Sequence, residues 1–339
     1  MRHLATFLAL ALVFNVLALA PQASRADDAM ILKVATISPE GTTLATALHS
    51  ASADIEKRTS GRVKMKVYPG AVMGNDSVVL RKMRSGQLSG SSFTAGGISS
   101  EYRDYQVMSL PMLLQKYSEV DAVRAKYEQF LTQQLDSHGF VSFGIMDAGF
   151  VYMMSSQPIR KPDDMKGRKI WIPEGDPVGR AVFDVAGVPP VPLQLPDVLT
   201  SLQTGMLDTV STSAIGAIVL QWYTKVKYLT ETPILYSYGT FAFSKDAWNK
   251  IPEQDKPAVR EIMTGYFKQV DQKNRKDNDA ALQSLKKQGL IFVPVDEQNK
   301  AKMQDMADKA IDKLLKSNLF DQSLVAGVRA TIQAVRQSK

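Results

Sequence analysis

Few residues in this 339-residue chain have the types and spacing that covalent chemistry requires. There is no cysteine, which excludes thiolate nucleophiles, disulfides and zinc–thiolate sites. His49 and His138 lie far apart in the sequence and have no neighbouring pair of carboxylates, so we interpret both as ordinary surface or helix residues. A Ser-His-Asp spacing and a glycine-rich phosphate loop are also absent from the sequence. We therefore expect no enzyme activity, no metal and no cofactor.

Binding chemistry is easier to find, in the stretch from Pro162 to Pro173. A polar turn with Gly167 leads into a short strand from Arg168 to Ile172, whose side chains alternate between two faces. Trp171 on this strand offers a flat ring that can stack on an apolar ligand or hold a cation over its face. The stretch predicts a contact with a small molecule rather than a catalytic step.

Acidic residues follow this strand. Glu174 and Asp176 would attract an amine or another cationic group on a ligand. Asp176 also precedes Pro177, and this order is typical of a helix N-cap followed by a first-turn proline. Both interpretations stay open at the level of the sequence.

The elements that must position these residues alternate between strand and helix from the start of the chain. The expected order is strand 31–36, a helix capped by Thr42 or Thr43, strand 63–67, a helix capped within 75–77, and a strand around 91–94. This order predicts a mixed or parallel sheet flanked by helices, and ligands of such sheets bind beyond the carboxyl ends of the strands. The loops after Thr36, Val67 and Thr94 are therefore candidate ligand loops.

The second half of the chain suggests another α/β unit. The expected elements are strands 141–146, 151–154, 207–210, 234–243 and 290–293, and helices 178–185, 196–204 and 257–288. We expect the chain to cross into this unit at Ala148-Gly149 and to return with strand 234–243. The predicted fold class is α/β and resembles a two-lobed periplasmic binding protein with a central cleft and crossing strands. Lobe I would comprise residues 27–148 and 238–275, and lobe II residues 149–237 and 276–339.

The first 26 residues have the pattern of a secretory signal peptide. A charged start at Arg2 precedes an apolar run over residues 4–20, and small residues at Ser24 and Ala26 fit cleavage after Ala26. An uncleaved anchor is the alternative, but the apolar run is short for one. Removing residues 1–26, with Arg2 and Arg25, leaves 313 of the 339 residues and lowers the formal charge from +7 to +5. We expect a mature protein of the periplasm that does not span the membrane.

Several short motifs then point to one family by their order and spacing. They are Tyr68-Pro69-Gly70, Arg84-Ser85-Gly86, Leu110-Pro111, residues 158–162, residues 164–170, residues 202–208, and Lys250-Ile251-Pro252. Together they resemble the solute-binding proteins of tripartite ATP-independent periplasmic (TRAP) transporters, the DctP family, over nearly the whole mature chain. The resemblance implies a secreted receptor that delivers a small organic ligand to the small and large membrane subunits of an ion-gradient-driven permease. It also implies a long helix spanning both lobes, for which 257–288 is the candidate.

The chain departs from that family at three positions of the expected pocket. The family usually has an arginine at the position of Trp171, where its planar guanidinium binds the ligand carboxylate with two parallel hydrogen bonds. Val151 stands where a basic residue is common, and Thr212 stands where asparagine is frequent. Because a buried carboxylate without a cationic partner is costly, these departures predict a ligand that is apolar or aromatic rather than a simple dicarboxylate.

Other residues could complete this pocket. Those that could extend the surface around Trp171 are Phe150, Tyr152, Met153, Leu195, Trp222, Tyr238 with Gly239, and Phe241. Core packing is an equal alternative for several of them. From the opposite lobe, positions at which the family contacts its ligand match Ser38, Glu40, Asp76 and Thr94.

Three alternative hypotheses for the function stay open. The protein could bind an organic acid through another basic residue, for which Arg168, Lys169 and Arg180 are candidates. It could be a receptor that reports a ligand to a membrane kinase. An exported hydrolase or lyase is a third alternative, disfavoured by the missing nucleophile–base pairs. Nucleic acid is not expected as a partner, because Lys and Arg are scattered among Asp and Glu rather than gathered in stripes.

Overall fold

A computed structural model describes residues 29–338, so the signal-peptide prediction for residues 1–26 lies outside the described residues. Its strands are β1 (Met30–Ala35), β2 (Val63–Tyr68), β3 (Gly90–Thr94), β4 (Phe140–Ser142), β5 (Met146–Ser155), β6 (Trp171–Pro173), β7 (Val191–Leu193), β8 (Thr209–Ser213), β9 (Tyr228–Thr230), β10 (Leu235–Ser244) and β11 (Ile291–Val293). Its α-helices are α1 (Thr43–Arg58), α2 (Asp76–Arg84), α3 (Ala95–Ile98), α4 (Tyr117–Ser137), α5 (Pro177–Ala186), α6 (Val198–Gln203), α7 (Ala214–Val219), α8 (Lys245–Lys250), α9 (Lys256–Lys287), α10 (Glu297–Lys316) and α11 (Gln322–Gln337).

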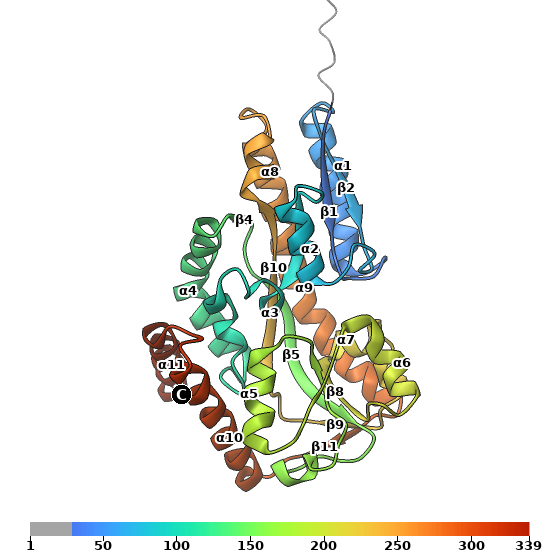
Figure 1. Cartoon of the computed structure of the whole chain (residues 1–339), viewed down its shortest axis with the longest axis vertical. Coiled ribbons are helices and arrows are strands. Elements are labelled where there is room, and N and C mark those ends of the chain that lie inside the picture. Colours follow the sequence, from blue (N-terminus) through green and yellow to red (C-terminus); the bar gives the residue numbers. More distant parts are fainter. Residues whose placement is uncertain (1–28, 339) are drawn as a thin grey trace, which may run out of the picture.

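Two long antiparallel strands, β5 and β10, form the spine of one sheet whose path runs β11-β9-β5-β10-β3-β1-β2. The C-terminal part of β10 pairs with β3 and β4, whereas the C-terminal part of β5 pairs with β8 and β9. The sheet therefore extends through both ends of the elongated molecule (Figure 1). We call the end with β1–β4 the upper half and the end with β6–β9 the lower half.

Local sequence explains the helices that carry the site. Thr42 caps α1 by accepting a hydrogen bond from the Ala45 amide at 3.3 Å, and the stripe through Leu48 and Ile55 is buried as its spacing predicts. Asn75 caps α2 in the same way, at 3.0 Å from the Val78 amide. Both helices begin where the sequence places their caps.

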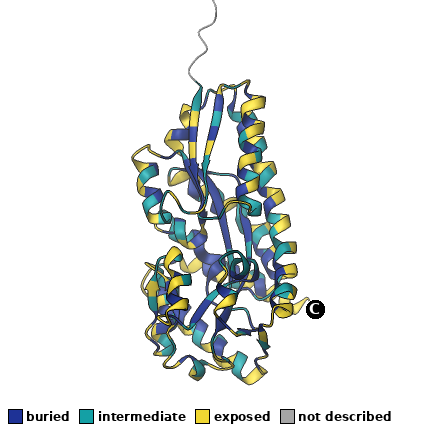
Figure 2. Ribbon diagram, turned by 90° about the vertical axis from the view of Figure 1, so that its right-hand side faces the viewer, coloured by how far each residue is buried: buried dark blue, intermediate teal, exposed yellow. Residues whose placement is uncertain are grey.

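Helix α9 packs against the cores of both halves. Phe267 and Val270 belong to the upper apolar cluster around Phe241, and Ala281 and Leu285 belong to the lower cluster around Trp222. The helix begins one residue before Pro257, which fits its first turn because proline lacks an N–H to pair there. The long helix predicted at 257–288 is confirmed, and Figure 2 shows the buried strands flanked by helices that expose their outer faces.

Several element boundaries predicted from the sequence are wrong. The strand expected at 141–146 ends at Ser142, because Gly144 has a φ of +114° and Glu128 accepts the Ile145 amide at 3.0 Å. Strand β6 covers only 171–173 instead of 168–172, and β8 covers 209–213 instead of 207–210. The helix expected from 196 is a 3₁₀ turn at 195–197 followed by α6.

The crossing expected at Ala148-Gly149 falls inside β5, where α9 holds the strand. Gly149 has a φ of +93°, and the partner strand shifts its register between Ser237 and Tyr238. Side-chain amides of α9 bind the strand's carbonyls here: Asn274 donates to Asp147 at 2.7 Å and Asn278 to Ala148 at 3.4 Å.

The lobe boundaries predicted from the sequence stay a prediction. Helix α11, placed in lobe II by that prediction, packs on α4 of the predicted lobe I, where Arg336 donates to Glu119 at 2.9 Å. None of the helices within residues 29–338 combines the length and apolarity that a bilayer span requires.

Candidate ligand-binding site

Trp171 lies on β6 with its side chain turned into the lower apolar cluster. Its neighbours Ile170 and Ile172 belong to a different cluster, as alternation along a strand requires. The indole is 7% exposed, its N–H donates to the Leu193 carbonyl at 3.0 Å, and its ring meets Trp222 edge-on at 5.1 Å. Because the N–H is satisfied within the protein, only the ring is left for contact with a ligand.

Other predicted residues surround the same cluster. Tyr152 and Leu195 are partly buried against it, and Thr212 lies directly opposite Tyr152 in the β5–β8 pair. Burial raises the pKa of Tyr152, and the nearby charge of Asp279 adds to this shift. Val151 is buried and faces Ser213 of β8 in the register of the same pair. The structure thus brings Trp171, Tyr152, Leu195 and Thr212 to one region of the lower half.

Tyr238 and Gly239 occupy the sheet itself. Tyr238 is fully buried, stacks on Tyr236 at 5.9 Å and donates its hydroxyl hydrogen to the Tyr105 carbonyl. Gly239 pairs with Thr94 of β3, and a Cβ here would stand 2.2 Å from the Phe93 carbonyl oxygen. The close approach of the two strands therefore requires glycine at position 239.

Asp76 and Thr94 meet in the upper half. The Asp76 carboxylate and the Thr94 hydroxyl are 3.3 Å apart, and Thr94 also caps α3 by accepting the Gly97 amide at 2.9 Å. A Cβ on Gly97 would stand 1.8 Å from the Asp76 carboxylate, so only glycine leaves room for it. Burial raises the pKa of Asp76 to about 7, against the smaller lowering effect of Thr94.

Ser38 and Glu40 lie on the loop after β1 but have different surroundings. The Ser38 amide donates to the Thr36 hydroxyl oxygen at 3.1 Å, and that oxygen also accepts from Ser92 of β3 at 2.6 Å. Glu40 is exposed and pairs with His49 at 3.3 Å. Ser38 is therefore tied to the strand that carries Thr94, whereas Glu40 is engaged on the surface.

A chain of side-chain hydrogen bonds joins the two halves at Glu174. The Asn75 amide donates to the Gln194 carbonyl oxygen, and the Gln194 amide donates to the Glu174 carboxylate. Asn75 precedes α2 in the upper half, whereas Gln194 follows β7 and Glu174 follows β6 in the lower half. Sequence reasoning identified Asn75 only as a cap and missed Gln194, although its position at the carboxyl end of a strand is a signal for it.

A second polar contact between the halves involves Asp176. Its carboxylate caps α5 by accepting the Val178 amide at 3.0 Å, which confirms the capping interpretation. Burial raises its pKa, and hydrogen bonds from backbone amides and from the Gln106 side chain oppose that shift, as does the charge of Arg103. Gln106 and Arg103 come from the 3₁₀ segment Arg103–Ser109 that follows α3, and neither was identified from the sequence.

The family model of DctP, described as a bacterial extracellular solute-binding protein, family 7, matches residues 34–318. The chain belongs to this family. A C4-dicarboxylate-binding periplasmic protein DctP of Rhodobacter capsulatus is 24% identical over 237 residues, which cover 69% of this chain and 71% of the relative. A solute-binding protein of Verminephrobacter eiseniae is 25% identical over 250 residues, covering 73% of this chain and 74% of that protein.

Solved structures show that the fold of this DctP-family protein is that of TRAP periplasmic solute-binding proteins. One from Sulfurospirillum deleyianum with bound succinate has a TM-score of 0.82 at 21% identity, covering 89% of this chain and 99% of that chain. A sugar acid binding protein from Advenella mimigardefordensis in complex with galactonate has a TM-score of 0.82 at 19% identity, covering 91% and 99%. The predicted α/β fold is thereby confirmed, and the relatives are solute-binding proteins rather than enzymes.

Two of the three basic residues proposed as substitutes for the missing arginine donate to backbone carbonyls in the DctP-family protein. Arg168 donates to the Asp164 carbonyl at 3.2 Å, and Lys169 donates to the Gly205 carbonyl at 2.7 Å. Arg180 is exposed on α5. Arg103, which donates to the Ser99 hydroxyl at 3.0 Å, is the basic residue whose charge acts on Asp176 instead.

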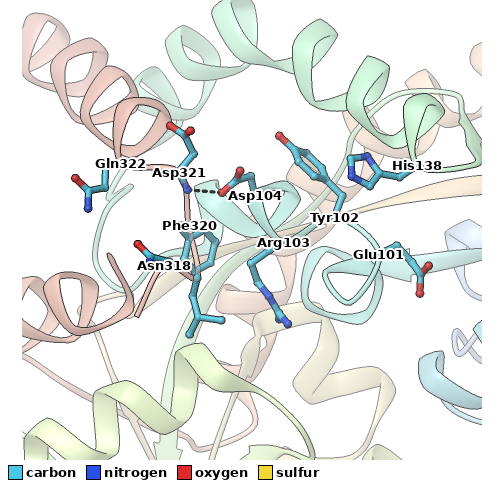
Figure 3. A pocket seen from close by; sticks show the side chains of 10 residues that line it. Glu101, Tyr102, Arg103, Asp104, His138, Asn318, Phe320, Asp321 and Gln322 are labelled. Carbon is cyan, nitrogen blue, oxygen red and sulfur yellow. Dashed lines mark hydrogen bonds between the residues drawn. The ribbon is translucent and has the colours of Figure 1, made fainter. Parts of the chain in front are cut away.

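Arg103 also lines a separate surface pocket. It is lined by residues 101–104, His138 and residues 318–322, with the Asp321 amide donating to Asp104 at 2.8 Å. Figure 3 shows the Arg103 side chain pointing away from that pair. This pocket contains none of the predicted ligand residues. Within the described part of the chain, His, Asp and Glu side chains do not gather as a metal site would require.

Proposed function

We propose that this DctP-family protein is a periplasmic receptor that captures a small organic molecule between its two halves and delivers it to a TRAP permease. The observation that supports this most directly is the chain of hydrogen bonds across the halves, Asn75–Gln194–Glu174, with Gln106 near Asp176 in addition. A ligand that contacts both sides stabilises the closed form by its differential affinity for that form. Such closure is what a membrane partner can recognise.

The ligand, in this proposal, presents an apolar or aromatic part to Trp171. The ring edge of Trp222 and the partly buried Tyr152 and Leu195 surround that surface. A carbon skeleton placed against it would lose apolar surface to water at about 25 cal/mol per Å². This predicts a ligand different from the succinate found in the Sulfurospirillum deleyianum protein.

An organic acid is the second candidate, favoured by one observation. The charge of Arg103 acts on Asp176, and a guanidinium can bind a carboxylate with two hydrogen bonds. The relatives with bound galactonate and succinate bind acids of this kind. For such a ligand, Arg103 would have to exchange its hydrogen bond to the Ser99 hydroxyl, at 3.0 Å, for one with the bound carboxylate.

Mass spectrometry of the natively purified protein tests the proposal. The protein is purified without denaturant, unfolded, and the released small molecules are identified and added back. An intact aromatic or apolar compound that raises the melting temperature supports the proposed receptor. A simple dicarboxylate that does the same favours the Arg103 alternative. A bound compound that the protein converts into another would contradict the receptor function.

A further inference from the structure

Six polar side chains from both halves form a closed ring of contacts beside Trp171. The hydrogen bonds Asn75–Gln194 and Gln194–Glu174 make one side, and Asp176, two residues after Glu174, lies near Gln106 on the other side. Helix α3 closes the ring. Gly97 lies against Asp76, and an ideal Cβ built on Gly96 would stand 3.3 Å from the Gln106 amide nitrogen. Leu193, whose carbonyl accepts the Trp171 N–H, directly precedes Gln194.

Gln106 has an unpaired acceptor at this ring. Its side chain is 6% exposed, and its Oε1 has no hydrogen-bond partner among the described residues. The amide orientation follows from its neighbour: the Asp176 carboxylate accepts hydrogen bonds, so the NH₂ group of Gln106 faces it and the oxygen is left over. Leaving a buried carbonyl oxygen unpaired is costly, so a donor on a ligand would stabilise the site.

Charge at the ring favours a cationic donor. Asp76, Glu174 and Asp176 contribute three carboxyl groups, and Arg103, whose charge acts on Asp176, contributes one guanidinium. Asp76 has the Thr94 hydroxyl as its side-chain partner at 3.3 Å, and no basic residue among those described forms an ion pair with it. Above pH 7, where Asp76 is ionised, the ring carries more carboxylates than guanidinium groups, next to an acceptor that lacks a donor.

We propose that the ligand carries a protonated amine, which binds inside this ring with Gln106 Oε1 as acceptor and Asp76 as counter-charge. The carbon skeleton of the amine would then extend toward Trp171, whose ring face can also interact with a cation. This inference rests on the proposed receptor function and adds the chemical class of the ligand to it.

Calorimetric titration of the mature full-length protein with matched compounds, which differ only in their head group, tests the inference. The probes share two skeletons: phenethylammonium, 2-phenylethanol and 3-phenylpropanoate, and propylammonium, 1-propanol and butanoate. The expected result is that an ammonium compound binds at least tenfold more tightly than the alcohol and carboxylate of its own set. An equally tight alcohol, a tighter carboxylate, or no binding by either ammonium compound would overturn the inference.

Two variants locate the binding. Asp76→Asn removes the counter-charge and Gln106→Met removes the acceptor while keeping similar volume; each is expected to weaken ammonium binding at least tenfold. Asp312→Asn, an exposed carboxylate on α10, is the control and should leave affinity unchanged. If thermal unfolding shows that Gln106→Met does not fold, the affinity of Asp76→Asn for the ammonium compounds tests the inference alone. Unchanged affinity in Asp76→Asn contradicts the inference.

The same experiment separates this inference from the receptor function. If a carboxylate probe binds and neither ammonium compound does, the receptor function stands and the amine assignment fails. If no probe binds and the natively purified protein releases no small molecule, both fail.

Discussion

The side-chain amide of Asn278 fills the place that a Cβ on Gly149 would need. Its Nδ2 atom lies 2.5 Å from that ideal Cβ position, and it donates to the adjacent Ala148 carbonyl at 3.4 Å. Its Oδ1 atom accepts the Ile215 amide of α7 at 3.2 Å. A residue without a side chain thus allows the long helix α9 to bind β5 and α7 at the level where the chain passes from the upper to the lower half.

Gly149→Ala should therefore destabilise the protein. The substitution places a Cβ against Asn278 and forces a non-glycine residue to a φ of +93°, for an expected loss of about 2–4 kcal/mol in the free energy of unfolding. Gly265→Ala is the matched control, because Gly265 lies within α9 with no atom near its ideal Cβ. Gly265→Ala should raise the free energy of unfolding by up to about 1 kcal/mol. Urea unfolding of the two variants measures both, and equal effects would contradict the packing argument.

Tyr236 should stabilise the charged form of Asp147, the carboxylate buried beside this crossing. The Tyr236 hydroxyl donates to Asp147 at 2.8 Å and Arg275 donates to it at 3.2 Å. Burial raises the pKa of Asp147 to about 6, and Tyr236 and Arg275 hold it from rising further. Tyr236→Phe should raise the pKa of Asp147 further. The loss in the free energy of unfolding should be larger at pH 8, where Asp147 is charged, than at pH 5, by about 1–2 kcal/mol. Denaturant unfolding at the two pH values checks this, and a cost independent of pH would contradict it.

Asp76→Asn should change the pH dependence of stability in a defined direction. The folded-state pKa of Asp76 is about 7 and its ordinary value is 3.8, so the folded protein holds a proton that the unfolded chain releases between these values. Wild-type stability therefore falls as pH rises from about 4 to 7, and this contribution disappears when Asp76 is replaced by Asn. At pH 8 the variant should be more stable by about 1–3 kcal/mol, and at pH 4 the two should be similar. A variant less stable at pH 8 would mean that ionised Asp76 is well paired.

Much of the fold could be predicted from the sequence because its signals are local. The cap residues Thr42 and Asn75 start their helices as expected, and the stripe around Phe267 predicts the long helix. The strand ends were less predictable. Gly144 adopts a φ of +114° and ends β4 although apolar residues continue on both sides, so hydrophobicity alone extended that strand too far.

The site was harder to predict, because its contacts come from residues distant in the chain. Asp76 and Thr94 were identified by resemblance to a family and Glu174 by its acidic side chain after a predicted strand, and their contact with a ligand stays a prediction. Gln106 carried no recognisable pattern, since an isolated glutamine is polar but not informative about position, and the only signal for Gln194 is its place directly after a short strand. Only the folded chain brings Gln194 between Asn75 and Glu174, across more than a hundred residues of sequence.

Replacing Trp171 should separate its packing role from ligand contact. Trp171→Ala removes a buried ring and should cost about 3–5 kcal/mol of unfolding free energy, whereas Trp171→Phe should cost less because it keeps a ring and loses the bond to Leu193. Ligand affinity should fall in both, and more in the alanine variant. Trp248→Phe, a buried tryptophan of the upper cluster, is the control and should lose stability without losing affinity. Equal affinity in wild type and Trp171→Phe, with reduced stability only, would assign Trp171 to the core.

Gln194→Ala should shift the ligand-free protein toward a more open form. Gln194 hydrogen-bonds Asn75 of the upper half and Glu174 of the lower half, so its loss removes one complete connection between them. With about 1 kcal/mol for each such bond, the ratio of closed to open molecules should fall about five- to thirtyfold. Small-angle X-ray scattering should then give a larger radius of gyration, and ligand affinity should fall because binding must supply more of the closure energy. Gln288→Ala at the exposed end of α9 is the control and should change neither quantity. An unchanged radius of gyration together with unchanged affinity in Gln194→Ala would show that this connection does not hold the halves together.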